Sequence, residues 1–407
     1  GGAALFMNEP SRRPGPLSNL LLTQFLTVVN DNIFKQVVLL IAVSTAVRFQ
    51  AYAALLFSVP FLLFAVLAGD CADRWSKSKV VYATKWAEVI IMLCASWALA
   101  SGDPLALGVT LFAMGTQSAF LGPAKYGLLP ELVSEAKLAR ANAKMQATVV
   151  AGIVIGTGAA GYLKTGLSEK LYLLGFLLAI IAGIGAFFAH RIGPTRPADP
   201  SRTLHWNPIQ RFRIGMNRAG QIPGLRPAML AHSVYWMGGS LLLLSWNELP
   251  QILDTSLGNW SAALGSLSLF LAAGALIAGR SLQTGIRPQQ VRIGAFGMAI
   301  GFGAIAFLPL SPWLIWGSAA IASLFSGMYL VPLRTRVQAL APVDSRGATL
   351  GTSQMLDFLG ISLASLLRPL LEQIAPGPLT AFLALGLIFL AAGLWFPSRL
   401  TRSSTTP

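Results

Sequence analysis

Two charged side chains, Asp31 and Lys35, lie four residues apart in a largely apolar segment, residues 17–47. Charges in a stretch long enough to cross a bilayer are costly, and they persist where they face a protein interior, a water-filled cavity or a substrate. At this spacing the two groups share one helix face and can pair. The pair either holds the helix against its neighbours or offers a zwitterionic ligand one acceptor and one donor. Asn30 and Asn32 add polar groups beside it, which favours the second reading.

Other polar residues in apolar stretches are candidates for the same chemistry. Glu248 precedes Pro250, where a helix can break and line a pore. Asp357 is the most isolated acid of the second half, and it is neutral, hydrated or paired across the bundle, with Lys35 or Lys125 as possible partners. The ammonium of Lys125 suits a phosphate. The alternative is that Lys125 is an interfacial anchor.

The composition indicates an all-α polytopic membrane protein. The chain is 54% hydrophobic and 11% charged, with a mean hydropathy of +0.64. A bilayer core of about 30 Å needs about 20 apolar residues per helix. Twelve stretches qualify as spans: 17–47, 50–70, 79–101, 104–122, 140–163, 170–190, 226–250, 260–280, 289–309, 312–332, 347–370 and 376–397.

The basic residues predict the orientation of these spans. With both termini in the cytoplasm, most of the 30 Lys and Arg residues fall in cytoplasmic loops or at the adjacent helix ends. Arg48, Lys164 and Lys170 are the exceptions outside. Lys85 and Glu88 lie near the cytoplasmic end of the third span, so we expect them to snorkel toward the surface. Topology thus accounts for the net charge of +15 without nucleic acid as a partner, and the basic loops can also hold anionic lipid headgroups.

Residues that would support catalysis or metal binding are scattered. His190, His205 and His232 are too far apart for a metal site, and Cys71 and Cys94 are not expected to form a disulfide. The sequence has no Gly-rich phosphate loop, no nucleophile elbow and no His-x-x-x-x-Asp pair. We therefore expect neither an enzyme nor a metal or cofactor.

Internal repetition predicts two six-helix halves. Three pairs of landmarks share a spacing of 209 or 210 residues: Gly69 with Gly279, Pro123 with Pro332, and Met145 with Met355. The two prolines are expected to end their spans. A shared spacing favours duplication.

The predicted domain boundaries follow from this repeat: tails at 1–16 and 398–407, halves at 17–190 and 226–397, and a cytoplasmic connector at 191–225. The first part of the connector is turn-rich, and residues 206–219 have the spacing of a surface helix. Gly1–Phe6 precede the first methionine and are left out of fold reasoning.

The loop Gly69–Lys79 resembles the Gly-x-x-x-Asp-Arg-x-x-Lys/Arg-x-Lys/Arg loop of the major facilitator superfamily, and it lies between spans two and three as in that family. The resemblance implies the family's twelve-helix fold. In the family this loop forms a charge-relay clasp that stabilises one access state. It therefore implies a gating role for Asp70, Asp73, Arg74 and Lys77. The alternative is that the basic residues only anchor the cytoplasmic side.

Further motifs are similar to those of the bacterial lysophospholipid transporter family: Gln24–Leu26 with Asn30–Asn32, Gly122–Gly127 with Leu129–Leu132, and Ala141–Ala143. The resemblance implies a flippase that carries lysophospholipids, chiefly lysophosphatidylethanolamine and lysophosphatidylglycerol, from the outer to the inner leaflet of the bacterial cytoplasmic membrane. An acyltransferase/acyl-carrier-protein synthetase re-acylates them there. Because this chain ends soon after span twelve, that enzyme is expected to be a separate partner.

The predicted substrate site has two departures from the family. Some relatives carry a Glu in span five, where Gln146 stands here, and a basic residue in span seven, which reads Ser240–Ser245 here without a charge. The expected substrate-binding residues are Asn30, Asp31, Asn32, Lys35, Lys125, Gln146, Glu248 and Asp357. The alternative function is a proton-coupled exporter of drugs or small metabolites. In that case Asp31 or Asp357 would be the protonation site.

Overall fold

The computed structural model describes residues 15–201, 203–204, 206–282, 288–342 and 346–400. Within these ranges the chain is helical and contains no strand, as predicted. The helices are α1 Pro16–Thr45, α2 Val47–Arg74, α3 Lys77–Ser101, α4 Pro104–Leu132, α5 Glu135–Gly166, α6 Tyr172–His190, α7 Pro208–Gln221, α8 Leu225–Trp246, α9 Leu249–Leu253, α10 Leu257–Leu282, α11 Pro288–Ile305, α12 Pro312–Leu340, α13 Arg346–Ile374 and α14 Leu379–Leu400, with a short 3₁₀ turn at Ser168–Lys170.

Several helix boundaries follow from local sequence. Pro16, Pro104 and Pro312 stand at the first position of α1, α4 and α12, where proline's fixed φ suits a helix and its missing N–H costs nothing. The Asp103 side chain caps α4 by accepting the N–H groups of Leu105 and Ala106.

Two prolines do not end their helices, and that prediction is wrong. Pro123 lies inside α4, which continues to Leu132, and Pro332 lies inside α12, which continues to Leu340. A proline within a helix leaves main-chain groups without their usual partner, but in membrane helices neighbouring groups and small adjustments satisfy them.

Eleven helices in the described part of the chain are long and apolar enough to cross a membrane. The remaining predicted span, 289–309, forms α11, whose first turns carry Gln289, Gln290 and Arg292 and are therefore less apolar. It packs between α12 and α14. The predicted span 226–250 is interrupted after Trp246, where α8 gives way to the short α9.

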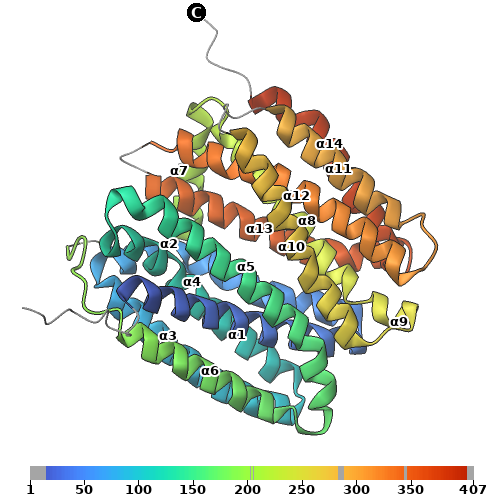
Figure 1. The fold of residues 1–407 in the computed structure, drawn as a ribbon, viewed down its shortest axis with the longest axis horizontal. Coiled ribbons are helices and arrows are strands. Elements are labelled where there is room, and N and C mark those ends of the chain that lie inside the picture. Colours follow the sequence, from blue (N-terminus) through green and yellow to red (C-terminus); the bar gives the residue numbers. More distant parts are fainter. Residues whose placement is uncertain (1–14, 202, 205, 283–287, 343–345, 401–407) are drawn as a thin grey trace, which may run out of the picture.

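The helices repeat as the landmarks predicted. α8, α10, α11, α12, α13 and α14 begin 207 to 211 residues after α1 to α6; Leu225 follows Pro16 by 209 residues, for example, and Arg346 follows Glu135 by 211. Figure 1 shows α1 to α6 and α8 to α14 as two groups side by side.

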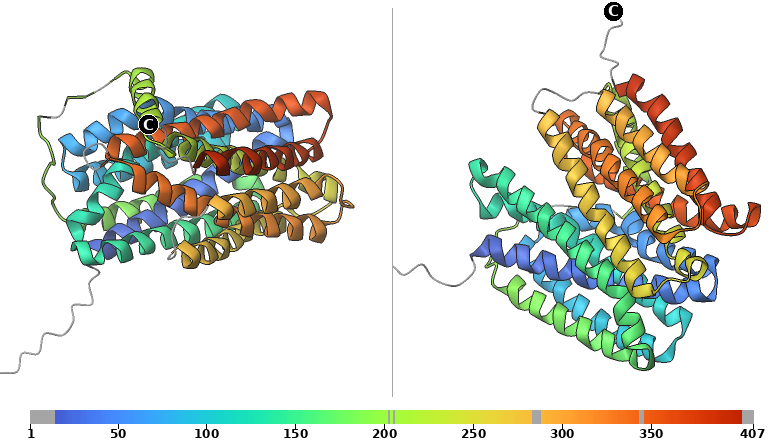
Figure 2. Two further views of the ribbon diagram at one scale, coloured as in Figure 1. Left: turned by 90° about the horizontal axis from the view of Figure 1, so that it is seen from above. Right: turned by 45° about the vertical axis from the view of Figure 1, so that its right-hand side comes forward.

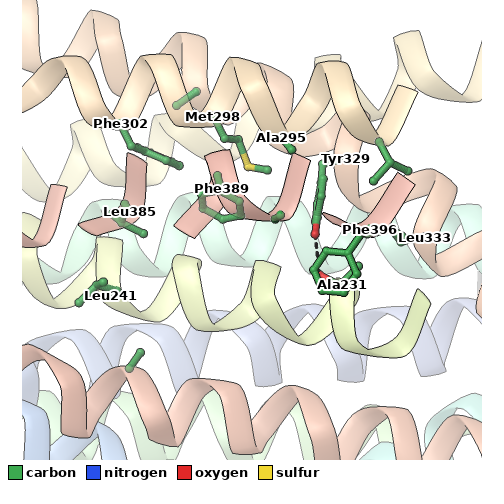
Figure 3. Close-up of a cluster of buried hydrophobic side chains, with 14 of the residues drawn as sticks. Ala231, Leu241, Ala295, Met298, Phe302, Tyr329, Leu333, Leu385, Phe389 and Phe396 are labelled. Atoms are coloured by element: carbon green, nitrogen blue, oxygen red, sulfur yellow. Dashed lines mark hydrogen bonds between the residues drawn. The ribbon is translucent and has the colours of Figure 1, made fainter. Parts of the chain in front are cut away.

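The buried apolar side chains divide at the same place. One cluster comes entirely from residues 219–400, and two others come from residues 20–192 with Leu244. In the first cluster, Tyr329 is fully buried and donates its hydroxyl to the Ala231 carbonyl oxygen at 2.9 Å, and Phe389 lies beside its ring (Figure 3). The main core of the second half is thus complete without side chains from α1 to α6.

The two groups meet through α2 against α13 and α5 against α10. We call the end at which α1 begins and α14 ends the terminal end, and the opposite end the far end. On α5, Gly161 and Tyr162 contact the start of α10, where the Tyr162 hydroxyl donates to Asn259 Oδ1 at 2.7 Å. Figures 1 and 2 show α5 and α10 close together near the far end and separating toward the terminal end.

Gly161→Ala is expected to destabilise the protein by about 1–3 kcal/mol, because overpacking at a tight contact forces the backbone apart. A Cβ there would lie 2.2 Å from the Leu257 main-chain oxygen. The melting temperature in detergent checks this. The matched control is Gly183→Ala in α6, which meets no atom within 4 Å and should be neutral or stabilising. Equal melting temperatures for the two variants would contradict the contact.

The connector contains α7, which confirms the helix predicted over 206–219. Its Phe212, Met216 and Ala219 side chains pack on the core of residues 219–400. α7 also contacts both α2 and α13 at the terminal end. It therefore touches both groups of helices.

Candidate functional site

A polar network inside α1, α3 and α4 surrounds one fully buried ion pair. Lys85 Nζ lies 2.5 Å from Glu88 Oε2, and neither side chain is exposed. Thr27 accepts a hydrogen bond from Lys85, while Asn30 and Gln117 donate to the Glu88 carboxylate at 2.8 and 3.3 Å. The prediction that Lys85 and Glu88 snorkel is wrong, because the bundle supplies partners for both groups inside.

Asp31 lies beside this network and is half-buried. Its Oδ2 accepts a hydrogen bond from the Ser118 hydroxyl at 2.8 Å, and its buried Oδ1 has no hydrogen-bond partner in the described part of the chain. The expected direct ion pair with Lys35 is not formed. Instead Lys35 donates to Asn32 Oδ1 at 3.4 Å and lies 5.2 Å from the centre of the Phe57 ring.

Lys125 completes this group of charges. It is half-buried, 5.4 Å from the centre of the Tyr126 ring, and the Asp31 carboxylate attracts both Lys125 and Lys35. Lys85 and Glu88 neutralise each other, so with every group ionised Asp31, Lys35 and Lys125 carry one positive charge in excess. One carboxylate oxygen without a partner beside two ammonium groups can hold an anion, or a ligand with both signs of charge.

Asp357 is not isolated. Its Oδ1 lies 2.8 Å from His232 Nδ1, which joins α13 to α8 within the second group of helices. The suggested partners Lys35 and Lys125 are therefore wrong. From the sequence, His232 was considered only as a metal ligand. A histidine inside an apolar span is nevertheless a signal that a polar partner is buried beside it.

Glu248 is likewise engaged. Arg368 on α13 holds it with Nε at 2.8 Å and with Nη2, and Nη2 also donates to Glu372 Oε2 at 2.6 Å. Sequence analysis missed Arg368, which lies within the predicted span 347–370 and whose side chain is completely buried. Gln146 is half-buried on α5, and no hydrogen bond ties it to the charged groups above.

The residues expected to form a gate lie at the terminal end, but the loop predicted over 69–79 is wrong. Asp70, Asp73 and Arg74 belong to the last turns of α2 and Lys77 begins α3, so only residues 75 and 76 connect the two helices. Lys77 Nζ is 2.6 Å from Glu131 Oε1 and so joins the start of α3 to the end of α4. The Asp73 main-chain oxygen accepts the N–H groups of both Ala198 and Asp199, which ties this part of the chain to the end of α2. Asp70 is buried and Arg74 is exposed.

Comparison with known sequences gives one family and a set of relatives. The model of the Major Facilitator Superfamily matches residues 20–365. The chain is 26% identical over 402 residues to the lysophospholipid transporter LplT of Klebsiella pneumoniae subsp. pneumoniae, covering 95% of this chain and 97% of that protein. It is 28% identical over 325 residues to the LplT of an Enterobacter species, covering 77% and 78%.

Solved structures share the fold at low sequence identity. A POT family transporter in complex with a thioalcohol-conjugated peptide has a TM-score of 0.74 at 13% identity, with 95% of this chain and 96% of that chain covered. The D-xylose–proton symporter has a TM-score of 0.73 at 14% identity, with 94% and 95% covered. These similarities concern the arrangement of helices alone.

Proposed function

This chain belongs to the major facilitator superfamily, and from that premise we propose that it moves lysophospholipids across the bilayer by alternating access. The observation that carries the proposal is the similarity to transporters named for lysophospholipids over 95% of the chain. Residues 17–190 and 226–397 are assigned as the halves that rock against each other, with 191–225 as the connector. A substrate held between such halves is exposed to each side in turn.

The headgroup is assigned to Asp31, Lys35 and Lys125. The Asp31 oxygen without a partner would accept the ammonium of an ethanolamine headgroup, and the two lysines would hold the phosphate. Asn32, which already contacts Lys35, would orient it. Asn30 supports this site from behind through Glu88.

The other three predicted ligands receive different assignments. Glu248 and Asp357 are satisfied by Arg368 and His232, so we assign them to holding the second half together. Gln146 is kept as a candidate for the headgroup's hydroxyl and ester oxygens. It stands on α5, which packs beside α1.

The gate is assigned to the end of α2 and the start of α3. The Lys77–Glu131 ion pair supports this assignment, because it fixes the start of α3 to the end of α4 next to Asp70, Asp73 and Arg74. Breaking and remaking such pairs would accompany opening of the terminal end.

We place the protein in the bacterial cytoplasmic membrane with both termini in the cytoplasm. This orientation puts most of the basic loops in the cytoplasm, as the positive-inside pattern requires. Transport proceeds without chemical change of the lipid. Re-acylation would then belong to an acyltransferase/acyl-carrier-protein synthetase that receives the lipid in the inner leaflet.

Leaflet-resolved uptake of fluorescent lysophosphatidylethanolamine into spheroplasts tests this proposal. Spheroplasts that express the chain should move the label to the inner leaflet faster than spheroplasts without it. Uptake should also survive an uncoupler. If the correctly inserted protein moves no lysolipid but expels small solutes in an uncoupler-sensitive manner, a proton-coupled exporter replaces the proposed function.

A further inference from the structure

A histidine and an aspartate form a side-chain pair in the second group of helices. His232 Nδ1 of α8 lies 2.8 Å from Asp357 Oδ1 of α13, and the two side chains are 11% and 12% exposed. Because a carboxylate only accepts hydrogen bonds, His232 carries its proton on Nδ1. In the neutral ring the other nitrogen, Nε2, is then a hydrogen-bond acceptor.

This acceptor is open to a ligand. His232 Nε2 makes no hydrogen bond in the described part of the chain and is not enclosed by it. The positive charge of the exposed Arg334 on α12 also acts on Asp357. The carboxylate therefore has a cation nearby while the imidazole stays neutral, and Nε2 stays an acceptor.

The main chain on both sides of His232 is held in place. The Tyr329 hydroxyl donates to the Ala231 carbonyl oxygen at 2.9 Å. The Ser233 hydroxyl donates to the Leu356 carbonyl oxygen, beside the aspartate, at 2.6 Å. A polar group supported in this way keeps one direction, as recognition of a single ligand group requires.

The pair also borders the contact between the two halves. Phe358, which follows Asp357, stacks on Phe61 of α2 with ring centres 3.8 Å apart. His232 lies seven residues from the terminal end of α8, and Lys125 lies seven residues from the terminal end of α4. Both are therefore about 10 Å along their helices from that end. A lipid whose phosphate contacts Lys125 would have its glycerol backbone at a similar depth to His232.

An apolar surface lies beside the acceptor. Trp236 follows one turn later on α8, with its ring centre 6.4 Å from that of His232, and it is 40% exposed. The glycerol backbone of a lysophospholipid has the matching pattern, because it carries one free hydroxyl next to the ester of its acyl chain. In a diacyl phospholipid with the same headgroup that hydroxyl is esterified and cannot donate a hydrogen bond.

We propose that His232 Nε2 accepts a hydrogen bond from the free glycerol hydroxyl of the lysophospholipid, and that Asp357 positions the imidazole for it. The inference rests on the proposed function and adds to it. Asp31, Lys35 and Lys125 bind the headgroup, which lipids with one and with two acyl chains share. A site that hydrogen-bonds a hydroxyl rejects an analogue without it, because the polar group of the site is left without a partner.

Uptake of two lipids that differ only at this hydroxyl tests the proposal. Spheroplasts that express the chain receive fluorescent lysophosphatidylethanolamine or its deoxy analogue, in which hydrogen replaces the glycerol hydroxyl. At low concentration the parent should move the hydroxyl lipid about five- to tenfold faster, the order set by one hydrogen bond. Equal rates would overturn this inference and leave the proposed function standing. A parent that moves neither lipid would contradict the proposed function, and this inference with it.

Substitutions show whether the preference comes from the pair. His232→Phe keeps a ring but has no acceptor, so it should move the two lipids at equal rates. Asp357→Leu should also lose the preference, whereas Asp357→Asn keeps an oxygen that accepts the Nδ1 hydrogen and should retain most of it. A purely structural role would slow both lipids alike and leave their ratio unchanged.

The matched control is His190→Phe, an exposed histidine on α6, which should keep the ratio of the parent. A folded His232→Phe variant that keeps this ratio would overturn the proposal. The comparison of the two lipids in the parent needs no substitution, so it decides the proposal where a variant fails to fold.

Discussion

Asp31→Asn is expected to lower the uptake of lysophosphatidylethanolamine about tenfold or more, the order set by one hydrogen bond between charged groups. The amide keeps the size of the side chain and can still accept the Ser118 hydroxyl. It loses the negative charge that would attract the headgroup ammonium. Initial uptake rates at equal expression, measured in spheroplasts, give the effect.

A second headgroup separates recognition from a general loss of activity. Lysophosphatidylglycerol has no ammonium, so Asp31→Asn should reduce its uptake much less, whereas Lys35→Ala and Lys125→Ala should impair both lipids through the phosphate. The matched control is Asp103→Asn, because Asp103 caps α4 at the far end and asparagine caps a helix equally well. Equal uptake of the ethanolamine lipid by Asp31→Asn and the parent would remove Asp31 from the site.

Lys85→Met is expected to be the most destabilising single change discussed here, at about 3–5 kcal/mol, because it leaves the Glu88 carboxylate buried without its cation. Neither side chain of this ion pair is exposed. Asn30 and Gln117 would remain as hydrogen-bond donors but carry no charge. Thermal unfolding in detergent, compared with the parent at equal lipid content, measures the loss.

The double variant Lys85→Met/Glu88→Met tests the cause. Apolar residues of similar volume often replace a buried ion pair at little cost, so the double variant should be more stable than Lys85→Met alone. Lys79→Met is the control on the same helix, since Lys79 is exposed and should matter by no more than about 0.5 kcal/mol. Additive losses at Lys85 and Glu88 would show that the two groups do not depend on each other.

The helices were largely predictable because each span is an apolar run whose length the bilayer sets. The residues at which the spans end were harder to predict. Pro123 and Pro332 were predicted to end their helices, yet α4 continues to Leu132 and α12 continues to Leu340. The helix predicted at 289–309 from its apolar run is present as α11, although its first residues are polar.

Polar positions were easier to predict than their partners. A spacing of four residues placed Asp31 and Lys35 on one face, but Ser118 and Asn32 took up their hydrogen bonds. Ser118 lies 87 residues from Asp31 in the chain. Spacing within one helix cannot indicate such a partner, because it is chosen by how separate helices pack.

The repeat retained the shape of the helices but not the charges of α1. Counted from the first residue of each helix, the positions of Asp31 and Lys35 in α1 correspond to Ser240 and Leu244 in α8. One half therefore presents two charges where its copy presents a hydroxyl and an aliphatic side chain. A ligand between α1 and α8 would meet charged side chains on α1 and no charge at the matching positions of α8. An amphiphile with a single tail would therefore enter in one orientation, with its polar end toward α1.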